Sequence, residues 1–363
     1  MKSREKRLGI PASNWRLAIA LAFGLTLLGC GAFTDTGRIS SYLSLAQQVG
    51  RSADGPVPLA VSMNLDNNWG ALITAINNAR VQVNLDLSRS TMTNTEFNPG
   101  NNGSTYIVSL VLPDAATSIA GDFNVFANLA SIRFPAAVDI GEANPFVGCT
   151  ALRFSLRGRG DLSVIEQGRA LVRGGSELVS YPSARGNVTL NGITSVGRSA
   201  FNGTNLESIS LPSVTTVGIR AFRGCEHLET ADLPSVTVID MEAFYGNTQL
   251  QNLNIPAVVS IGNNAAANTG GTDLAITVGI ALETIGTGMF NEIGIRKNVT
   301  VRTPESEVDN ITAMRDAIRG RGWDEGSFTL AAGRNQTTGT GWNQRTVWVN
   351  NINANINLTV EGY

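Results

Sequence analysis

Few residues of this chain have the types and spacing that catalysis requires. His227 is the only histidine, so a histidine metal cluster or a histidine pair cannot form. The acidic group Glu305, Glu307 and Asp309 lacks the spacing and the glycine of a calcium loop, and acidic residues in a first helical turn are expected from the helix dipole. The sequence shows no Ser-centred elbow, phosphate loop or CxxC motif. We therefore expect no catalytic, metal or cofactor site, and no enzyme.

The N-terminal residues have the plan of a secretory signal that ends at Cys30. Five basic residues accompany an uncharged apolar stretch, Leu17–Leu28. This stretch is shorter than the roughly 20 residues of a membrane span and fits the core of a signal peptide. Its end, Leu27-Leu28-Gly29-Cys30, resembles the bacterial lipobox, in which the cysteine thiol is acylated before cleavage. We expect a signal peptide over residues 1–29 and a lipid on Cys30; the alternative is an ordinary signal peptide with a chance cysteine.

The charge balance excludes one class of partner. The whole chain has a formal net charge of −2, and removal of residues 1–29, with five basic residues and one acidic residue, leaves −6. A mildly acidic body lacks the basic patch that nucleic-acid binding needs, so we expect no nucleic-acid partner.

Internal repeats determine which elements carry the remaining candidate residues. The segments Val196–Phe201, Val217–Phe222 and Ile239–Phe244 share the pattern Val/Ile-x-x-x-Ala-Phe, and the Leu/Ile-Pro pairs beside them are 22 residues apart. Degenerate copies extend both ways. The first position of the pattern, which we call the Val/Ile position, recurs eight times: at Ile119, Ile140, Ile165, Val196, Val217, Ile239, Ile261 and Ile285.

The alternation of apolar and polar residues predicts how one coil folds. In Leu206–Leu211, apolar side chains point inward and Ser210 lies between two of them, as strand alternation requires. Pro212 then ends the strand, and the Ala-Phe pair returns the chain with Phe in the interior. Because no coil buries its apolar face alone, neighbouring coils stack into a solenoid with parallel strands. We predict about eight coils of roughly 22 residues over residues 105–300.

The pattern L-x-x-L-x-L-P…V-x-x-I-G-x-x-A-F-x-G-C resembles the leucine-rich repeat of BspA-like bacterial surface proteins. Arg223-Gly224-Cys225 and Val147-Gly148-Cys149 reproduce the Gly-Cys step. The resemblance implies a strand-rich α/β leucine-rich repeat solenoid. It also implies a surface-exposed outer-membrane lipoprotein that acts as an adhesin for fibronectin, fibrinogen or other bacteria. The alternative is a periplasmic or envelope scaffold for protein–protein interaction.

The segments that flank the repeats are predicted to be a tether and two caps. We expect an open, lipidated tether over residues 30–58, because Gly55-Pro56 and Pro58 disfavour regular structure. An N-terminal cap over 59–104 contains a helix, capped by a residue among Asp66 to Asn68, and a following strand. The apolar positions of that helix and strand are Trp69, Leu72, Ile73, Ile76 and Ala79, and then Val81, Val83, Leu85 and Leu87.

A C-terminal cap is predicted over residues 301–363. Thr303-Pro304 begins a helix that Gly320 ends. A final, half-buried strand is predicted over Ile352–Val360, where apolar residues alternate with polar ones.

Cys149 and Cys225 occupy the same repeat position three coils apart. At about 4.8 Å per strand, roughly 14 Å separates them, which is twice the reach of a disulfide. We therefore expect two buried thiols.

Two surfaces are candidates for binding. Arg159-Gly160-Asp161 resembles the tripeptide that integrins recognise, and it falls in a small insertion that we expect to be a surface loop; a chance occurrence is the alternative. The second surface is the outward row of three stacked strands, which either binds a partner or is simply solvated. Its residues are Glu207, Ser208, Ser210, Glu229, Thr230, Asp232, Gln251, Asn252 and Asn254.

Overall fold

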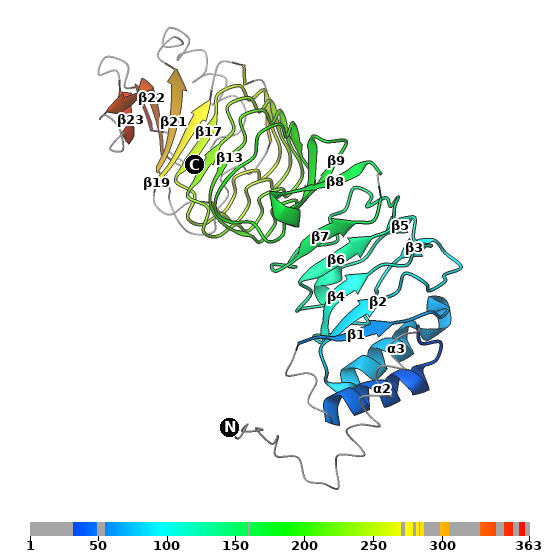
Figure 1. The fold of residues 1–363 in the computed structure, drawn as a ribbon. Helices are drawn as coiled ribbons and strands as arrows, with labels where there is room; N and C mark the ends of the chain where they lie inside the picture. Colours follow the sequence, from blue (N-terminus) through cyan, green and yellow to red (C-terminus); the bar gives the residue numbers. More distant parts are fainter. Residues whose placement is uncertain are drawn as a thin grey trace, which may run out of the picture. The chain divides into compact units, whose positions relative to one another are not determined.

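The chain folds into two compact units, residues 1–139 with 155–159 and residues 140–154 with 160–363 (Figure 1). The computed structural model describes residues 32–48, 55–158, 160–269, 273–278, 281–282 and 284–286, and the strands 298–304, 327–338, 345–350 and 356–359. Cys30 and Arg159 lie outside the described residues, as do Glu305, Glu307 and Asp309. Among the described residues, no helix has the length and hydrophobicity of a membrane span.

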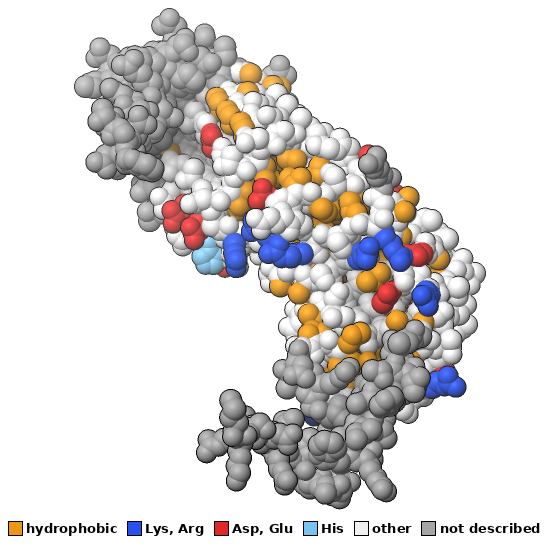
Figure 2. All heavy atoms as spheres, in the orientation of Figure 1, with side chains coloured by type: hydrophobic (Ala, Val, Ile, Leu, Met, Phe, Trp, Pro, Cys, Tyr) orange, Lys and Arg blue, Asp and Glu red, His pale blue; other side chains and the backbone are white. Residues whose placement is uncertain are grey.

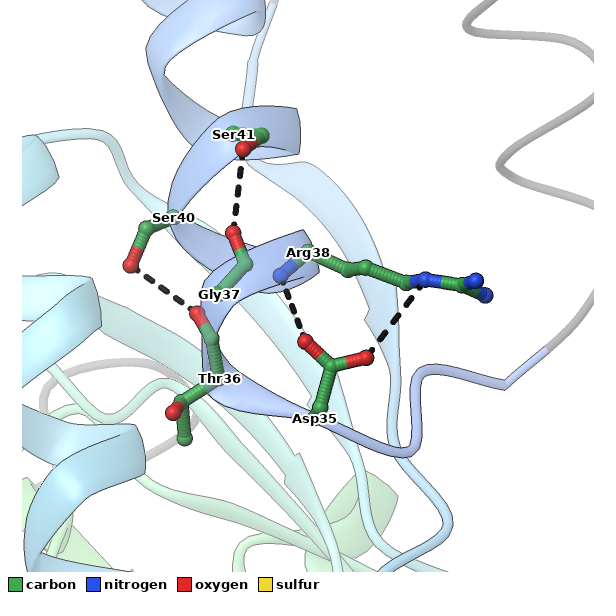
Figure 3. Close-up of polar contacts among 6 residues, drawn as sticks. All are labelled: Asp35, Thr36, Gly37, Arg38, Ser40 and Ser41. Carbon is green, nitrogen blue, oxygen red and sulfur yellow. Dashed lines mark hydrogen bonds and ion pairs between the residues drawn. The ribbon is translucent and has the colours of Figure 1, made fainter.

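Helix α2, Thr36–Gln48, corrects the prediction of an open tether. Asp35 caps this helix: the main-chain N–H of Arg38 donates to Asp35 Oδ1 at 2.8 Å, and Arg38 Nε lies 3.5 Å from Oδ2 (Figure 3). Its apolar side chains recur at helical spacing and are buried: Ile39, Tyr42, Leu43 and Ala46. The tether prediction relied on Gly55-Pro56 and overlooked this pattern.

Helix α3, Leu65–Ala79, is the predicted N-terminal helix, and α2 lies against it (Figure 1). All five predicted apolar residues of its face are buried. The cap is Asn64 and not a residue from Asp66 to Asn68, since Asn64 Oδ1 accepts from the N–H of Asp66 at 2.9 Å. The predicted strand is β2, Val83–Asp86, and its four predicted apolar positions are buried.

The first unit contains the beginning of the solenoid. A five-stranded sheet, of which all but the first two residues of β7 belong to this unit, has the order β1-β2-β4-β6-β7, with β1 Val57–Ala60, β4 Ile107–Val111, β6 Ser131–Phe134 and β7 Arg153–Leu156. A second, two-stranded sheet pairs β3 (Glu96–Phe97) with β5 (Ser118–Ile119), and η2 (Phe123–Val125) follows. The solenoid has about ten turns rather than the predicted eight, and one of the added turns is the coil of β2 and β3, which precedes the first predicted Val/Ile position.

Two sheets form the walls of the second unit. The shorter strands lie in the order β20-β18-β16-β14-β12-β10-β9-β8. They are Thr284–Ile285, Ser260–Ile261, Val238–Ile239, Thr216–Val217, Ser195–Val196, Glu177–Ser180, Ala170–Arg173 and Leu162–Ile165. The other sheet has the order β11-β13-β15-β17-β19-β21-β22-β23, and β24 also pairs with β22. These strands are Arg185–Thr189, Asn205–Ser210, Thr230–Asp232, Asn252–Ile255, Asp273–Val278, Asn298–Pro304, Ser327–Thr338, Arg345–Asn350 and Ile356–Thr359.

Stacked aromatic rings fill the core between these walls. The rings of Phe201 and Phe222 lie 4.9 Å apart, and those of Phe222 and Phe244 lie 5.0 Å apart, with interplanar angles of 10° and 6°. All three side chains are fully buried, as predicted. The spacing equals that of neighbouring strands, so each Phe packs on its equivalent in the next coil.

The segment 160–192 differs from the predicted coil. Ile165 does not occupy the Val/Ile position, because it lies in β8, which forms an antiparallel hairpin with β9. The parallel pairing of β10 with β12 places Leu178 opposite Val196, so Leu178 takes that position. Between β8 and β9, η3 (Glu166–Gly168) turns the chain.

Tyr181 takes the position of the core phenylalanine in this coil. Its N–H donates to Ala200 O at 2.8 Å, as the N–H of Phe201 donates to Ala221 O at the same distance. The ring centroids of Tyr181 and Phe201 are 5.7 Å apart. Tyr181 therefore extends the aromatic stack by one coil toward the inserted hairpin.

The C-terminal strands lie where the cap was predicted. Thr303 and Pro304 end strand β21 and do not begin a helix; the rest of the predicted helix lies outside the described residues. Strand β24 falls within the predicted final strand and pairs antiparallel with β22.

Candidate functional site

Strands β13, β15 and β17, with the residue before each of the last two, place the nine predicted binding residues side by side. We call this surface the strand face. Parallel register aligns Ser208 with Thr230 and Asn252 in one row. A second row aligns three further residues: Ser210, Asp232 and Asn254. The alternate side chains of the same strands are buried, which fixes the polar row outward: Ile209, Ala231 and Leu253.

Hydrogen bonds between coils connect the second row. Asn254 Nδ2 donates to Asp232 Oδ1 at 2.6 Å, and Ser210 Oγ donates to the other oxygen, Oδ2, at 3.4 Å. In the first row Ser208 Oγ donates to Asn187 Oδ1 at 2.8 Å. These contacts order the polar side chains before any partner arrives, which lowers the entropic cost of binding.

Two carboxylates project from the same surface. The N–H of Glu229 donates to Glu207 O at 2.9 Å, and that of Gln251 donates to Glu229 O at the same distance, so the three residues are stacked. All three are exposed, and neither glutamate forms an ion pair with a residue in the described ranges. The strand face is therefore a row of acceptors and acidic groups suited to donor-rich or cationic groups of a partner.

Sequence reasoning missed one member of this surface. Asn187, on β11, aligns with Ser208 and extends the first row by one coil. The signal was the alternation around buried Val188, which stands 21 residues before Ile209, the step that also separates Val196 from Val217.

Elsewhere on the described coils, ion pairs connect neighbouring turns. Arg220 Nε donates to Glu242 Oε2 at 2.9 Å, and Arg223 bonds the same oxygen while it lies 4.8 Å from the centroid of the Tyr245 ring. The hydrogen bond from Arg220 holds the pKa of Glu242 below its ordinary value. Figure 2 shows charged side chains gathered in patches, with short rows of hydrophobic side chains among uncharged surface.

The Arg-Gly-Asp triplet stands at the start of the β8–β9 hairpin. Gly160 and Asp161 are exposed. The carbonyl of Asp161 accepts from the N–H of Gly174 at 3.0 Å, so the backbone is fixed while the carboxylate points away from the core. The triplet is thus attached to a hairpin and not to a loop within a coil.

The cysteine prediction is confirmed: Cys149 and Cys225 are both buried, and no disulfide joins them. Burial raises the pKa of the Cys225 thiol from 9.0 to about 11. Its Sγ donates to Phe201 O at 3.0 Å. A buried thiol with a raised pKa is a poor nucleophile, so Cys225 has a packing role.

No chemistry emerges from the other candidates. His227 is exposed beside buried Leu228. Within the described ranges, no three His, Cys, Asp or Glu side chains are grouped closely enough to hold a metal ion.

The stacked coils define the chain as a leucine-rich repeat protein, and its sequence shows which kind. Residues 186–309 match the BspA-type leucine-rich repeat region, in six copies. Over these residues the chain is a BspA-type leucine-rich repeat protein, as the repeat pattern predicted. A search of curated proteins finds no significant match.

Two solved structures resemble the fold at low identity. One is the pneumococcal vaccine antigen PcpA, with 15% identity and a TM-score of 0.37 over 75% of this chain and 78% of that chain. The other is a leucine-rich cell surface protein from Faecalibacterium prausnitzii, with 18% identity and a TM-score of 0.35 over 59% of this chain and 79% of that chain. These similarities are too distant to carry an argument about function.

Proposed function

We propose that this protein is a non-enzymatic adhesin that binds host proteins through the strand face. The observation that carries the proposal is the continuous polar surface of β13, β15 and β17, fixed by parallel register and by hydrogen bonds between coils. Leucine-rich repeat solenoids generally bind proteins through extended surfaces of this kind. Aligned acceptors and exposed carboxylates favour a partner that presents basic and amide groups.

The partner class follows from the resemblance to BspA-like proteins, which implies fibronectin and fibrinogen. The test is biolayer interferometry of the full chain on each immobilised protein. Asn252→Arg places a long cation in the centre of the strand face, and we expect at least tenfold weaker binding. The matched control is Thr216→Arg, at a half-buried position of β14 outside the strand face, which should bind as the wild type does. No binding to either protein, or equal loss in both variants, would overturn the proposal.

We further propose that Cys30 carries the lipid and that the solenoid is exposed at the outer-membrane surface. The support is the signal-peptide plan that ends at Cys30. The test is protease digestion of intact cells, with Cys30→Ala as the control. Rapid digestion of the wild type, with release of the variant from the membrane fraction, is expected. Protection until the outer envelope is breached would favour the periplasmic scaffold instead.

Asp161 supports a second, smaller proposal, namely integrin binding through Arg159-Gly160-Asp161. The exposed carboxylate on a fixed backbone favours this reading. Asp161→Ala should leave the melting temperature unchanged, because only the main chain of Asp161 is bonded to Gly174, and should abolish integrin-dependent cell attachment. Attachment that survives the substitution would show that the triplet is incidental.

A further inference from the structure

The turn that follows each long strand of the regular coils is closed by a hydrogen bond. The N–H of Val214 donates to Leu211 O at 3.3 Å, and the N–H of Val236 donates to Leu233 O at 3.2 Å. Each of these turns has proline as its second residue. Proline fixes φ at the value that this position of a β-turn requires. The regular turns are therefore rigid.

The equivalent turn after strand β11 has the sequence Asn191-Gly192. The N–H groups of Leu190 and Leu211 each donate to a carbonyl of the next coil, at 3.1 Å and 3.0 Å, so the two leucines are equivalent. Asn191 consequently takes the place of Pro212. The φ of Gly192 is +78°, which is the value of the third residue of a type II turn. This coil has thus replaced a rigid dipeptide with a permissive one.

The groups of this turn are exposed and free. Asn191 and Gly192 are both exposed, and in the described part of the chain neither the Asn191 side chain nor the Gly192 N–H makes a hydrogen bond. The N–H of Ile193 donates to no carbonyl in those ranges either, so the turn is open. A Cβ on Gly192 would meet no atom within 4 Å. The Asn191 side chain can therefore rotate onto the Gly192 nitrogen without breaking a contact.

The two other Asn-Gly pairs of the chain, Asn102-Gly103 and Asn202-Gly203, are held by hydrogen bonds. The N–H of Gly203 donates to Arg223 O at 2.9 Å, and the N–H of Gly103 donates to the carbonyl two residues before it at 3.1 Å. A reaction at either nitrogen first requires local opening, which costs free energy. Asn191 stands apart because its neighbour needs no such opening.

We propose that Asn191 is a site of spontaneous deamidation through a succinimide. The Gly192 nitrogen attacks the side-chain carbonyl carbon, Cγ, of Asn191, and a five-membered imide ring forms. The bond from Cγ to the amide nitrogen breaks, and ammonia leaves with the proton of the Gly192 N–H. Water then opens the ring at one of its two carbonyl groups, which gives aspartate or isoaspartate. Glycine favours the attack because it has no Cβ to obstruct it.

Each conversion adds one negative charge directly after β11, which is the edge strand of its sheet. Isoaspartate also adds one methylene group to the main chain. Buried Leu190 and Ile193 hold the two ends of the turn, and the turn has no closing hydrogen bond to lose. The reaction needs no partner, so it occurs whether or not the strand face binds a host protein.

The test is peptide mapping by mass spectrometry while the folded full chain is incubated in mildly alkaline buffer. We expect Asn191 to convert at least tenfold faster than Asn102 and Asn202, and to give isoaspartate, detected by enzymatic methylation, as well as aspartate. In denaturant the three sites should convert at similar rates, because the hydrogen bonds that protect two of them are lost.

Two variants complete the test. Gly192→Ala places a methyl group beside the attacking nitrogen and should slow conversion of Asn191 at least tenfold, while Asn102 and Asn202 convert as before. Because alanine disfavours a positive φ, Asn191→Gln is the second variant; it keeps the glycine, lengthens the side chain and should also slow conversion at least tenfold. Conversion of Asn191 no faster than that of Asn102 and Asn202 in the folded chain would overturn the inference. Aspartate without isoaspartate would overturn it as well.

Discussion

The coils over residues 193–262 and the segment over 160–192 build the same kind of buried core from different lengths of chain. In the regular coils the Val/Ile position recurs at Val196, Val217, Ile239 and Ile261, and every short strand pairs in parallel with the next. In the earlier segment an antiparallel hairpin is inserted, and the step from Leu178 to Val196 is shorter than a regular repeat. Both regions nevertheless maintain the same aromatic stack.

The difference shows that the stacked core, and not the spacing in the sequence, defines a coil. Tyr181 and Leu178 are only three residues apart, whereas Val196 and Phe201 are five apart, yet the two pairs occupy equivalent positions. The hairpin strands β8 and β9 extend the sheet beyond β10, and Ala170 and Val172 of β9 join the buried core. The insertion is thus accommodated at the end of the sheet, where its buried residues lengthen the core and the parallel pairing of the regular coils is kept.

The largest expected effect is at the centre of the regular coils. Phe222→Ala removes a fully buried ring that stacks on two others, and the cost should be about 3–5 kcal/mol in free energy of unfolding. Chemical denaturation measures it. Val164→Ala, at a half-buried site in the hairpin, is the comparison and should cost much less. An equal loss in both variants would contradict the distinction between core and insertion.

A smaller effect is expected where the coils approach each other closely. Gly262→Ala would force a Cβ to within 2.5 Å of the Met241 backbone, so we expect about 1–3 kcal/mol of destabilisation from overpacking. Gly175→Ala, beside the hairpin, meets nothing within 4 Å and should cost only the strain of its positive φ, about 1 kcal/mol. Thermal unfolding of the two variants tests the order.

Cys225 gives the regular coils a dependence on alkaline pH. Its folded pKa of about 11 exceeds the ordinary value of 9.0, so the unfolded chain loses this proton first as the pH rises. The stability that the neutral thiol contributes is present below pH 9 and is lost between pH 9 and 11. The melting temperature should therefore fall more steeply across this range in the wild type than in Cys225→Ser. Parallel curves would contradict burial of the thiol.

The smallest effect is expected in the irregular coil. The Tyr181 hydroxyl is buried and makes no hydrogen bond of ordinary geometry in the described part of the chain; burial, together with the nearby Glu166 carboxylate, raises its pKa. Tyr181→Phe removes this unsatisfied group, keeps the ring and restores the regular residue type. The variant should be as stable as the wild type or more stable by up to about 1 kcal/mol. Destabilisation in urea would show that the hydroxyl is bonded in solution.

The regular coils could be predicted almost completely, because each position repeats and its burial follows from strand alternation. Ile165 was assigned to the wrong position because the prediction counted residues from coil to coil, and a hairpin makes that count unreliable. Helix α2 was not predicted because proline and glycine near residue 55 favour open structure. The spacing of Ile39, Tyr42 and Leu43 upstream is nevertheless helical. The strand-face residues could be found from alternation alone, but their hydrogen bonds depend on register between coils.

Carboxylate footprinting shows whether a bound partner covers the strand face. The full chain is labelled with a carbodiimide and an amine, with and without bound fibronectin or fibrinogen, whichever binds more tightly, and the modified peptides are measured by mass spectrometry. We predict that Glu207 and Glu229 lose most of their labelling in the complex, while exposed Glu226, which lies off these strands, keeps its labelling. Unchanged labelling of Glu207 and Glu229 in a saturated complex would contradict it.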